Sequence, residues 1–483
     1  MTDFPILSAI VLVPLIAGVL TVLIPAAQTT LIKVVNLLAG VICAGLSAQI
    51  WFSYDMSVGG YQMVEEIPWV AHLGINYILA ADGIGVVLTA LNAIVFLTGV
   101  HTMWTLEHRV KEFFAFMALL VFGVFGVFLS LDIFVFFFFY EVAVLPMYPL
   151  IAIWGSTRKE YSAMKLTLYL MVGSALLFPS LTALWVQAGA TSWDIRVLAE
   201  AGAYSTDFQI WLYPFIYVGF GILAGMFPFH GWSPTGHVAA PTAVSMLHAG
   251  VLMKLGAFGI LRIGIELLPE GALYWAPTFA ALATVNIVYG AFVAMRQTDF
   301  KYVIGFSSVS HMGIVLLGLN TLGIDGMSGA VFQMFAHGIM TALFFSAVGF
   351  IYDQTHDRDI NHYGGLASQL PVATAFFILA GLCGMGVPGF ASFWAELLVF
   401  VAAIETFPVL GVLAIAGLVI TAAYMLRVLG KAMFGPTNPQ WDDLVEPTAW
   451  LAIPRIILAI VLLLFGFFPS WILDVIRLAM LGG

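Results

Sequence analysis

Long apolar runs alternate with short polar connections along almost the whole chain. A run of about 20 apolar residues forms a helix long enough to cross the roughly 30 Å hydrocarbon core of a bilayer. Such runs cover residues 3–24, 31–53, 79–104, 112–130, 132–154, 162–188, 210–230, 239–267, 273–296, 300–322, 326–352, 370–404, 408–432 and 450–481. The pattern predicts an all-α polytopic membrane protein with about 14 transmembrane helices.

Two stretches of the chain carry Gly/Pro-rich interruptions. The run 370–404 is too long for one plain crossing and contains GMGVPGF at 384–390. Its counterpart is the patch 221–236, where we expect a helix to break, turn through a polar His-Trp-Pro-His segment and resume as a second helix. Broken helices in corresponding positions are typical of inverted-repeat transporters, whose sites lie at the breaks. We expect two inverted five-helix repeats, at 112–267 and 268–432, with flanking helices in 1–111 and a C-terminal flanking helix in 433–483.

The basic residues predict the orientation. When the crossings are numbered alternately, one side collects Lys33, Arg109, Lys111, Arg158, Lys159, Arg296, Lys301, Arg358, Arg427, Lys431 and Arg455, and the other Arg196, Arg262 and Arg477. The positive-inside rule assigns the first side to the cytoplasm, which leaves both termini outside. The start of the chain lacks a basic region and a cleavage site, so we interpret it as a retained helix.

Composition excludes several classes of protein. The chain is 62% hydrophobic and 9% charged, with a formal net charge of −10 and no basic cluster, which argues against nucleic-acid binding. Its two cysteines lie in separate apolar runs, so they predict neither an iron–sulfur cluster, nor a zinc site, nor a disulfide. No pair of runs carries two well-spaced histidines each, so haem is not expected either. We expect no cofactor and no metal in this chain.

Ionisable residues inside the apolar runs are the candidate functional groups. A lysine at the membrane centre costs roughly 2.5–3.5 kcal/mol on insertion scales, and such groups usually mark ion or proton pathways. Lys254 is one, and Glu141 and Glu396 are carboxylates in other runs. An acid and a base whose proton affinities depend on each other can store and release a proton. The alternative is that each is a neutral, hydrogen-bonded structural group.

Further polar residues extend this set. His248, His311 and His337 lie in apolar runs, and Ser307, Ser308, Ser310 and Gln333 lie near them in sequence, which suggests a polar path. Lys165 either joins this path or extends its amine to the interface. We expect His230 and His237 to hold the geometry of a cytoplasmic turn.

Four stretches carry a resemblance to a known family. Residues 228–259, PFHGWSPTGHVAAPTAVSMLHAGVLMKLGAFG, resemble the P-x-H-x-W-x-P-x-x-H block of the antiporter-like subunits of respiratory complex I. Residues 137–174, 299–313 and 386–397 are similar to the family's fifth and sixth helices and to its later helices. The resemblance covers essentially the whole chain, and its acid at Glu396 and short C-terminus favour the M-type subunit.

The resemblance implies roles for particular residues. Glu141, Lys254 and Glu396 match the family's helix-five glutamate, helix-eight lysine and helix-twelve acid, and His311 and His337 match its histidines. The chain departs from the family at Leu223 and Gly225, where a lysine and a proline are usual. The usual partner of Glu141 is therefore missing. His248, about 9 Å along the helix from Lys254, is a candidate substitute.

The resemblance implies a proton-translocating membrane subunit of a complex I-like redox pump, an NADH-quinone oxidoreductase. We expect proton transfer through Glu141, Lys165, His248, Lys254, His311, His337 and Glu396. FMN, iron–sulfur clusters and quinone are expected in partner subunits, among them neighbouring antiporter-like subunits, in a bacterial plasma membrane. The alternatives are a subunit of a multi-subunit cation/proton antiporter or membrane hydrogenase, or a structural membrane subunit that does not pump.

Overall fold

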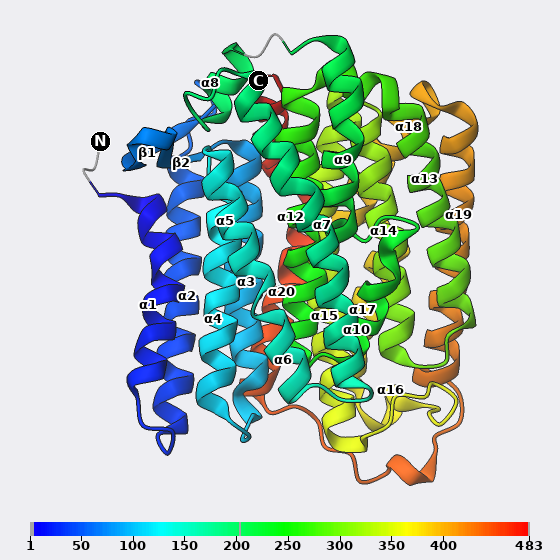
Figure 1. Ribbon diagram of the computed structural model, residues 1–483. Helices are drawn as coiled ribbons and strands as arrows, with labels where there is room; N and C mark the ends of the chain where they lie inside the picture. The colour runs from blue at the N-terminus through cyan, green and yellow to red at the C-terminus, as the bar shows by residue number, and fades with distance from the viewer. Residues whose placement is uncertain (1–3, 202–203, 482–483) are drawn as a thin grey trace.

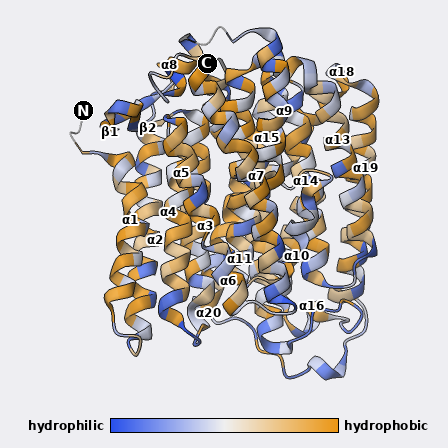
Figure 2. Cartoon of the chain, in the orientation of Figure 1, coloured by the Kyte–Doolittle hydropathy of each residue, from blue (hydrophilic) through white to orange (hydrophobic). Residues whose placement is uncertain are grey.

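The computed structural model describes residues 4–201 and 204–481, and it consists of helices that run side by side through one bundle (Figure 1). Hydrophobic residues cover the middle of the bundle and polar residues gather toward its ends (Figure 2). Within the described residues, 13 helices are long and apolar enough to cross a membrane. Helices α17 (Pro371–Gly384) and α18 (Ala391–Thr406) together supply one further crossing. The prediction of a polytopic helical protein with about fourteen crossings is confirmed.

The N-terminal part contains a small sheet that the sequence did not predict. The chain runs through α1 (Ile6–Leu23), α2 (Thr29–Ser53), an antiparallel pair of strands β1 (Gln62–Val70) and β2 (Ile75–Ala81), and α3 (Gly83–Thr102). The carboxylate of Glu65 on β1 accepts hydrogen bonds from the backbone amides of Leu7 (2.8 Å) and Ser8 (2.9 Å). These amides have no partner within their helix, so the sheet caps α1.

Pro146 divides the next expected crossing, 132–154. After α4 (Val110–Leu129), the chain forms α5 (Ile133–Val144) and α6 (Met147–Trp154) instead of one helix. A proline lacks the amide that would continue the helix, and its ring crowds the preceding turn. The division falls about one turn beyond Glu141.

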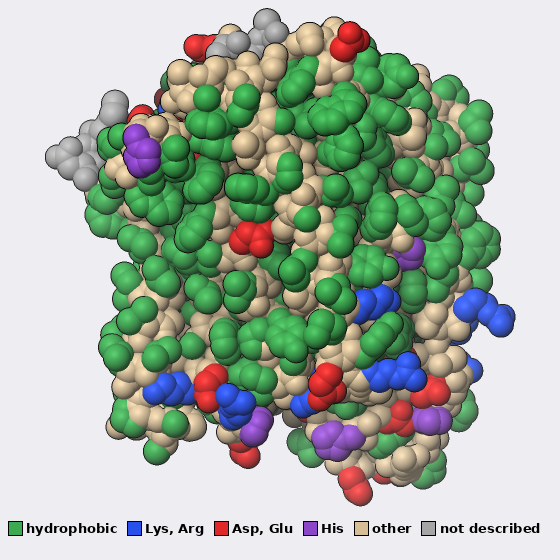
Figure 3. All heavy atoms as spheres, in the orientation of Figure 1, with side chains coloured by type: hydrophobic (Ala, Val, Ile, Leu, Met, Phe, Trp, Pro, Cys, Tyr) green, Lys and Arg blue, Asp and Glu red, His purple; other side chains and the backbone are tan. Residues whose placement is uncertain are grey.

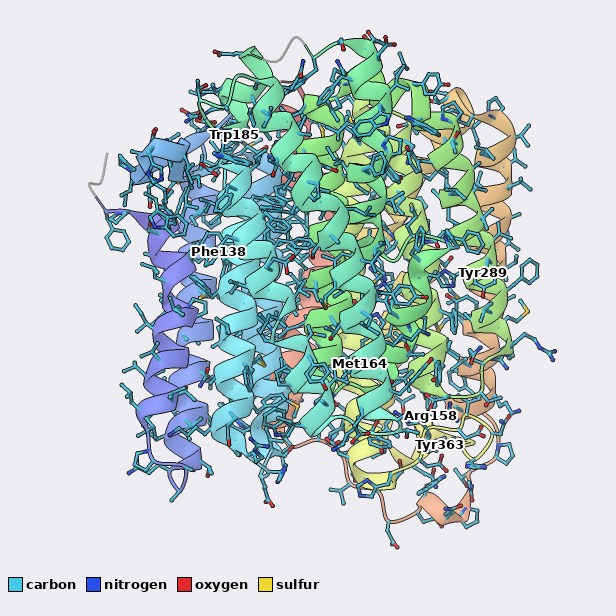
Figure 4. The ribbon with its side chains drawn as sticks, in the orientation of Figure 1. Phe138, Arg158, Met164, Trp185, Tyr289 and Tyr363 are labelled. Atoms are coloured by element: carbon cyan, nitrogen blue, oxygen red, sulfur yellow. The ribbon has the colours of Figure 1, made fainter. Side chains whose placement is uncertain are left out.

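Two further helices complete this part of the chain. α7 (Lys159–Gln187) spans the bundle from beside Arg158 at one end to Trp185 near the other (Figure 4). The short α8 (Ile195–Ala201) follows at the latter end.

The first broken helix is present, but the turn expected within it is elsewhere. α9 (Thr206–Ala224) ends at Gly225, whose φ of +75° is in the left-handed region that favours glycine. A 3₁₀ turn (Phe229–Gly231) and α10 (Trp232–Ala239) then continue the same crossing. The chain reverses only at Ala240–Pro241. The His-Trp-Pro-His segment is thus the second half of the broken helix, and its assignment to a cytoplasmic turn was wrong.

The crossing that carries Lys254 is the central one. It consists of α11 (Thr242–Leu247), a π-helical segment (His248–Leu252), α12 (Met253–Gly259) and a second π-helical segment (Ile260–Ile265). Its apolar stretch is wholly buried by the rest of the chain. π-helical turns are rare and frequently occur at functional sites.

The second half of the chain contains the second broken helix. Its elements are α13 (Pro269–Arg296), α14 (Phe300–Asn320), α15 (Ile324–Thr355), α16 (Leu366–Gln369), α17, α18 and α19 (Pro408–Val428). The predicted interruption lies between α17 and α18, where Gly386 (φ +67°) and Gly389 (φ +100°) turn the backbone. The repeat boundaries at 112–267 and 268–432 stay a prediction.

The C-terminal run forms two helices instead of one. α20 (Ala449–Phe467) crosses the bundle, and α21 (Ser470–Leu481) follows after Pro469. The expectation of a single helix at 450–481 was therefore wrong, because Pro469 interrupts it. The two ends of the chain lie toward the same end of the bundle (Figure 1), as an even number of crossings requires.

The crossing of α12 over α9 depends on Gly256. A Cβ at this position would overlap the carbonyl oxygen of Phe220 and lie 2.6 Å from the backbone nitrogen of Ala224. Gly256→Ala should therefore destabilise the fold by about 1–3 kcal/mol, as overpacking does. We expect a lower thermal unfolding midpoint for the purified protein. Gly45→Ala is the control, since a Cβ there meets nothing within 4 Å. Equal midpoints for the two variants would contradict this packing.

Candidate functional site

A chain of buried polar side chains runs from Lys254 to Glu396. The Lys254 ammonium donates to Nδ1 of His337 over 2.7 Å, and the His337 and His311 rings have their centres 5.3 Å apart. Nδ1 of His311 lies 3.3 Å from a carboxylate oxygen of Glu396. Nε2 of Gln333 lies 3.2 Å from that nitrogen and 3.2 Å from that oxygen. These five residues come from α12, α14, α15 and α18, and the structure brings together four of the predicted site residues.

The backbone around Lys254 leaves a carbonyl free for its side chain. The ammonium also donates to the carbonyl of Ala249, which lies in the first π-helical segment. Lys254 has no exposed surface at all. A buried ammonium is costly unless it is hydrogen-bonded. The imidazole of His337 and this carbonyl supply the bonds.

A second group of polar residues lies between Lys254 and the Ala240–Pro241 turn. The His237 and His248 rings have their centres 4.1 Å apart, and Trp232 stacks on His248 at 5.0 Å. Nε2 of His237 lies 3.0 Å from the hydroxyl of Ser233. Neither ring nitrogen of His248 is hydrogen-bonded within residues 4–201 and 204–481. His237 is therefore a buried neighbour of the candidate site rather than part of an exposed turn.

Glu141 lies apart from this chain of contacts. It is half-buried on α5, and the hydroxyl of Ser174 on α7 donates to its carboxylate. A side cavity of about 340 Å³ adjoins it, lined also by Tyr148, Thr167 and Met171. Figure 3 shows acidic atoms within the otherwise hydrophobic side face of the bundle. The partial exposure of Glu141 and the cavity beside it show that its carboxylate is accessible from the surface of the bundle.

Aromatic side chains fill the region between α5 and α9. The ring of Phe220 lies 5.8 Å from that of Tyr140 and 5.9 Å from that of Phe136, and Phe136 also stacks with Phe258 of α12 at 6.1 Å. Leu223 is fully buried one turn after Phe220. His248 contacts Trp232 and His237 instead of Glu141. Its expected role as a substitute partner of Glu141 therefore finds no contact among the described residues.

Lys165 occupies an intermediate position. It is half-buried on α7, and its amine lies 6.0 Å from the centre of the Tyr161 ring. The amine also lies 3.5 Å from where a Cβ of Gly231 would stand, so it contacts the break of the first interrupted helix. No hydrogen bond joins it to Lys254 or Glu141 in the described part of the chain.

Three buried cations were not predicted from the sequence. Lys301 and Arg455 were counted among the cytoplasmic loop cations, yet each has only 3% of its surface exposed. Arg262 was counted on the other side, and it is 7% exposed. Lys301 lies in the first turn of α14, Arg455 in the second turn of α20 and Arg262 in the second π-helical segment, and apolar residues directly follow each of them. That pattern was the available signal. Among residues 4–201 and 204–481, no three His, Cys, Asp or Glu side chains are placed to hold a metal ion.

A buried row of base, imidazole and acid inside a polytopic bundle is the arrangement found in proton-translocating membrane proteins. The sequence model of the family described as NADH:quinone oxidoreductase/Mrp antiporter, transmembrane, matches residues 130–421. This chain belongs to that family.

Curated relatives of this chain include chains of NAD(P)H-quinone oxidoreductases. The chain is 35% identical over 455 residues to NAD(P)H-quinone oxidoreductase chain 4 3 of a Picosynechococcus species. The alignment covers 92% of this chain and 82% of the relative. The fold resembles a chain of respiratory complex I from Thermus thermophilus, with a TM-score of 0.90 at 24% identity over 99% of this chain and 100% of the other. It also resembles a chain of the Mrp complex from a Dietzia species, with a TM-score of 0.88 at 21% identity over 99% and 97%.

The contact between Ser174 and Glu141 can be tested directly. Ser174→Ala removes the donor to the carboxylate, so the infrared band of the Glu141 side chain, assigned by its loss in Glu141→Gln, should shift. Ser180→Ala is the control, because the Ser180 hydroxyl bonds only the Leu176 carbonyl of its own helix. An unshifted band in Ser174→Ala would show that the contact does not form in the membrane.

Proposed function

We propose that this chain is the proton-translocating M-type membrane subunit of a complex I-like, redox-driven pump, an NADH-quinone oxidoreductase. Protons pass through Lys254, His337, His311 and Glu396. Electrons pass through partner subunits that hold FMN, iron–sulfur clusters and quinone. The identity of 35% to a quinone oxidoreductase chain over most of this chain supports the assignment.

One observation carries the proposal, namely the row of contacts from Lys254 to Glu396 in the buried core. A lysine ammonium that donates to Nδ1 of an imidazole can pass it a proton, and the imidazole can release another from Nε2. Nε2 of His337 has no partner in the described residues. The 5.3 Å between the two ring centres leaves the histidines within reach of one bridging water. Glu396 then accepts the proton from His311.

The direction of transfer is part of the proposal. Basic residues gather at the end opposite the termini, which supports a cytoplasmic assignment for that end. The chain then lies in a bacterial plasma membrane with both termini outside. Lys254 is loaded from the cytoplasm, His248 and His237 lie on its cytoplasmic side, and release occurs outward near Glu396. The resemblance to complex I subunits supports this direction.

Glu141 couples the chain to its neighbours in this proposal. Its partial exposure on the side of the bundle supports contact with another membrane subunit. A change in its charge alters the free energy of the ammonium at Lys254 through the low-dielectric interior. Lys165, beside the break of the first interrupted helix, contributes to the same polar environment.

A multi-subunit cation/proton antiporter is the second candidate, since the family description and the fold similarity to the Mrp complex both include it. The two functions differ in the proteins that co-purify with this chain. Iron–sulfur and quinone-reactive subunits support the redox pump, and small antiporter subunits support the other.

Lys254→Ala should lower proton translocation in the assembled complex about tenfold or more, because a positioned proton-transfer group commonly contributes at least that factor. Proton uptake per electron in sealed vesicles measures the effect. Lys431→Ala, which removes an exposed lysine, should leave it unchanged. Normal pumping by Lys254→Ala would exclude the mechanism.

Glu141→Gln should also strongly lower pumping while the complex still assembles, because it removes the charge that acts on Lys254. The matched control is Glu405→Gln, which neutralises an exposed carboxylate at the end of α18. Co-purification of partner subunits checks assembly in both variants. If the two variants pump equally well, Glu141 has no coupling role.

A further inference from the structure

A large cavity opens at the end of the bundle opposite the termini. Its volume is about 880 Å³. Its walls come from the ends of α3, α6 and α15, the segment 103–108, the Ala240–Thr242 turn, the first turn of α14 and the first two turns of α20. Four charged side chains line it, namely Glu107, Lys301, Asp353 and Arg455. None of them belongs to the row from Lys254 to Glu396.

The two cations of this cavity are fixed by backbone carbonyls. Arg455 donates from Nε (3.2 Å) and an Nη (2.9 Å) to the carbonyl of Ser346, and its guanidinium lies 4.9 Å from the Phe350 ring centre. Lys301 donates to the carbonyl of Ala240 over 2.8 Å. Both cations are buried, so they form the floor of the cavity rather than its rim.

Asp353 differs from both cations. It is exposed, it lines the cavity, and its carboxylate has no hydrogen bond or ion pair within residues 4–201 and 204–481. Lys301 and Arg455 lie close enough to act on it electrostatically. A free carboxylate that faces water beside two buried cations can exchange protons with the water of the cavity.

The floor of the cavity leads to the histidine pair. The Ala240 carbonyl that binds Lys301 also accepts a hydrogen bond from the Ser245 hydroxyl at 3.2 Å. That hydroxyl lies 2.9 Å from the carbonyl of His237, whose ring contacts His248. The Ala240 carbonyl and Ser245 thus connect Lys301 to the backbone of His237, and the charge of Lys301 is close enough to act on the His237 ring.

We propose that this cavity is the cytoplasmic entrance of the proton path, with Asp353 as the uptake group and Lys301 as the group that passes the proton inward. The Lys301 ammonium gives its proton inward to the histidine pair through water and becomes a neutral amine. Asp353 then takes a proton from cavity water and gives it to that amine, which restores the Lys301 ammonium. Each step moves one proton, and no charge accumulates. This inference rests on the proposed function.

The test uses the whole detergent-solubilised complex, in which no proton gradient opposes turnover. Asp353→Ala should slow electron transfer to quinone severalfold, because proton uptake limits a tightly coupled pump. Acetate should restore the rate, since a small acid can deliver protons to the floor of the cavity, whereas chloride at equal ionic strength should not. Asp353→Glu should keep most of the rate. Glu107→Gln, which alters a carboxylate on the rim of the same cavity, is the matched control.

Blocking the cavity supplies an independent measurement. Thr105→Cys places a thiol on its wall, and a bulky charged thiol reagent should then slow turnover. The same reagent should have no effect on Thr437→Cys, an exposed site at the same end but outside the cavity. The two native cysteines are buried.

The outcomes separate this inference from the proposed function. Normal turnover of Asp353→Ala and of the blocked Thr105→Cys, in preparations where Lys254→Ala is inactive, would overturn the entrance and leave the pump in place. A slow Asp353→Ala that chloride restores as well as acetate would assign Asp353 a structural role and also overturn it. An active Lys254→Ala would instead overturn the proposed function.

Discussion

A lysine ammonium without any contact with solvent is the constraint on which the rest of the bundle depends. Lys254 lies in a crossing that is wholly surrounded by protein, and its charge is stabilised by the His337 imidazole and the Ala249 carbonyl. The carbonyl comes from a π-helical segment, and the imidazole from a long helix packed against it. Glycines let the neighbouring backbones approach closely, as Gly256 does against α9. The close helix packing and the polar contacts thus both act on the Lys254 ammonium: the packing buries it, and the contacts stabilise its charge.

The two broken helices place polar groups at depths where an unbroken helix would present only apolar side chains. The first break precedes α10, which positions His237 beside His248, and the second precedes α18, which positions Glu396 beside His311. Breaks of this kind are tolerated only where protein or water surrounds them. The two breaks lie on either side of Lys254. Each one thus positions a polar side chain close to the buried polar residues around Lys254.

The sequence predicted the helices, both breaks and four members of the polar row, because apolar length, Gly/Pro placement and charge within apolar runs are local signals. It failed where distant contacts decide the structure. The strand pair before α3 depends on contacts such as that between Glu65 and the start of α1, 57 and 58 residues away. Whether Lys301 and Arg455 lie in loops or in the core depends on which helix ends surround them. The position of the turn at Ala240–Pro241 instead of at His237 could have been judged from Pro241.

Leu223 is part of an apolar region between the helices that carry Glu141 and Lys254. Among the described residues, no polar side chain joins Glu141 to Lys254, and Phe136, Phe220 and Phe258 occupy the space between their helices. A proton cannot hop through such a layer, whereas an electric field passes through it with little screening. The coupling proposed between Glu141 and Lys254 is therefore electrostatic, and it needs no transfer of a proton from one to the other.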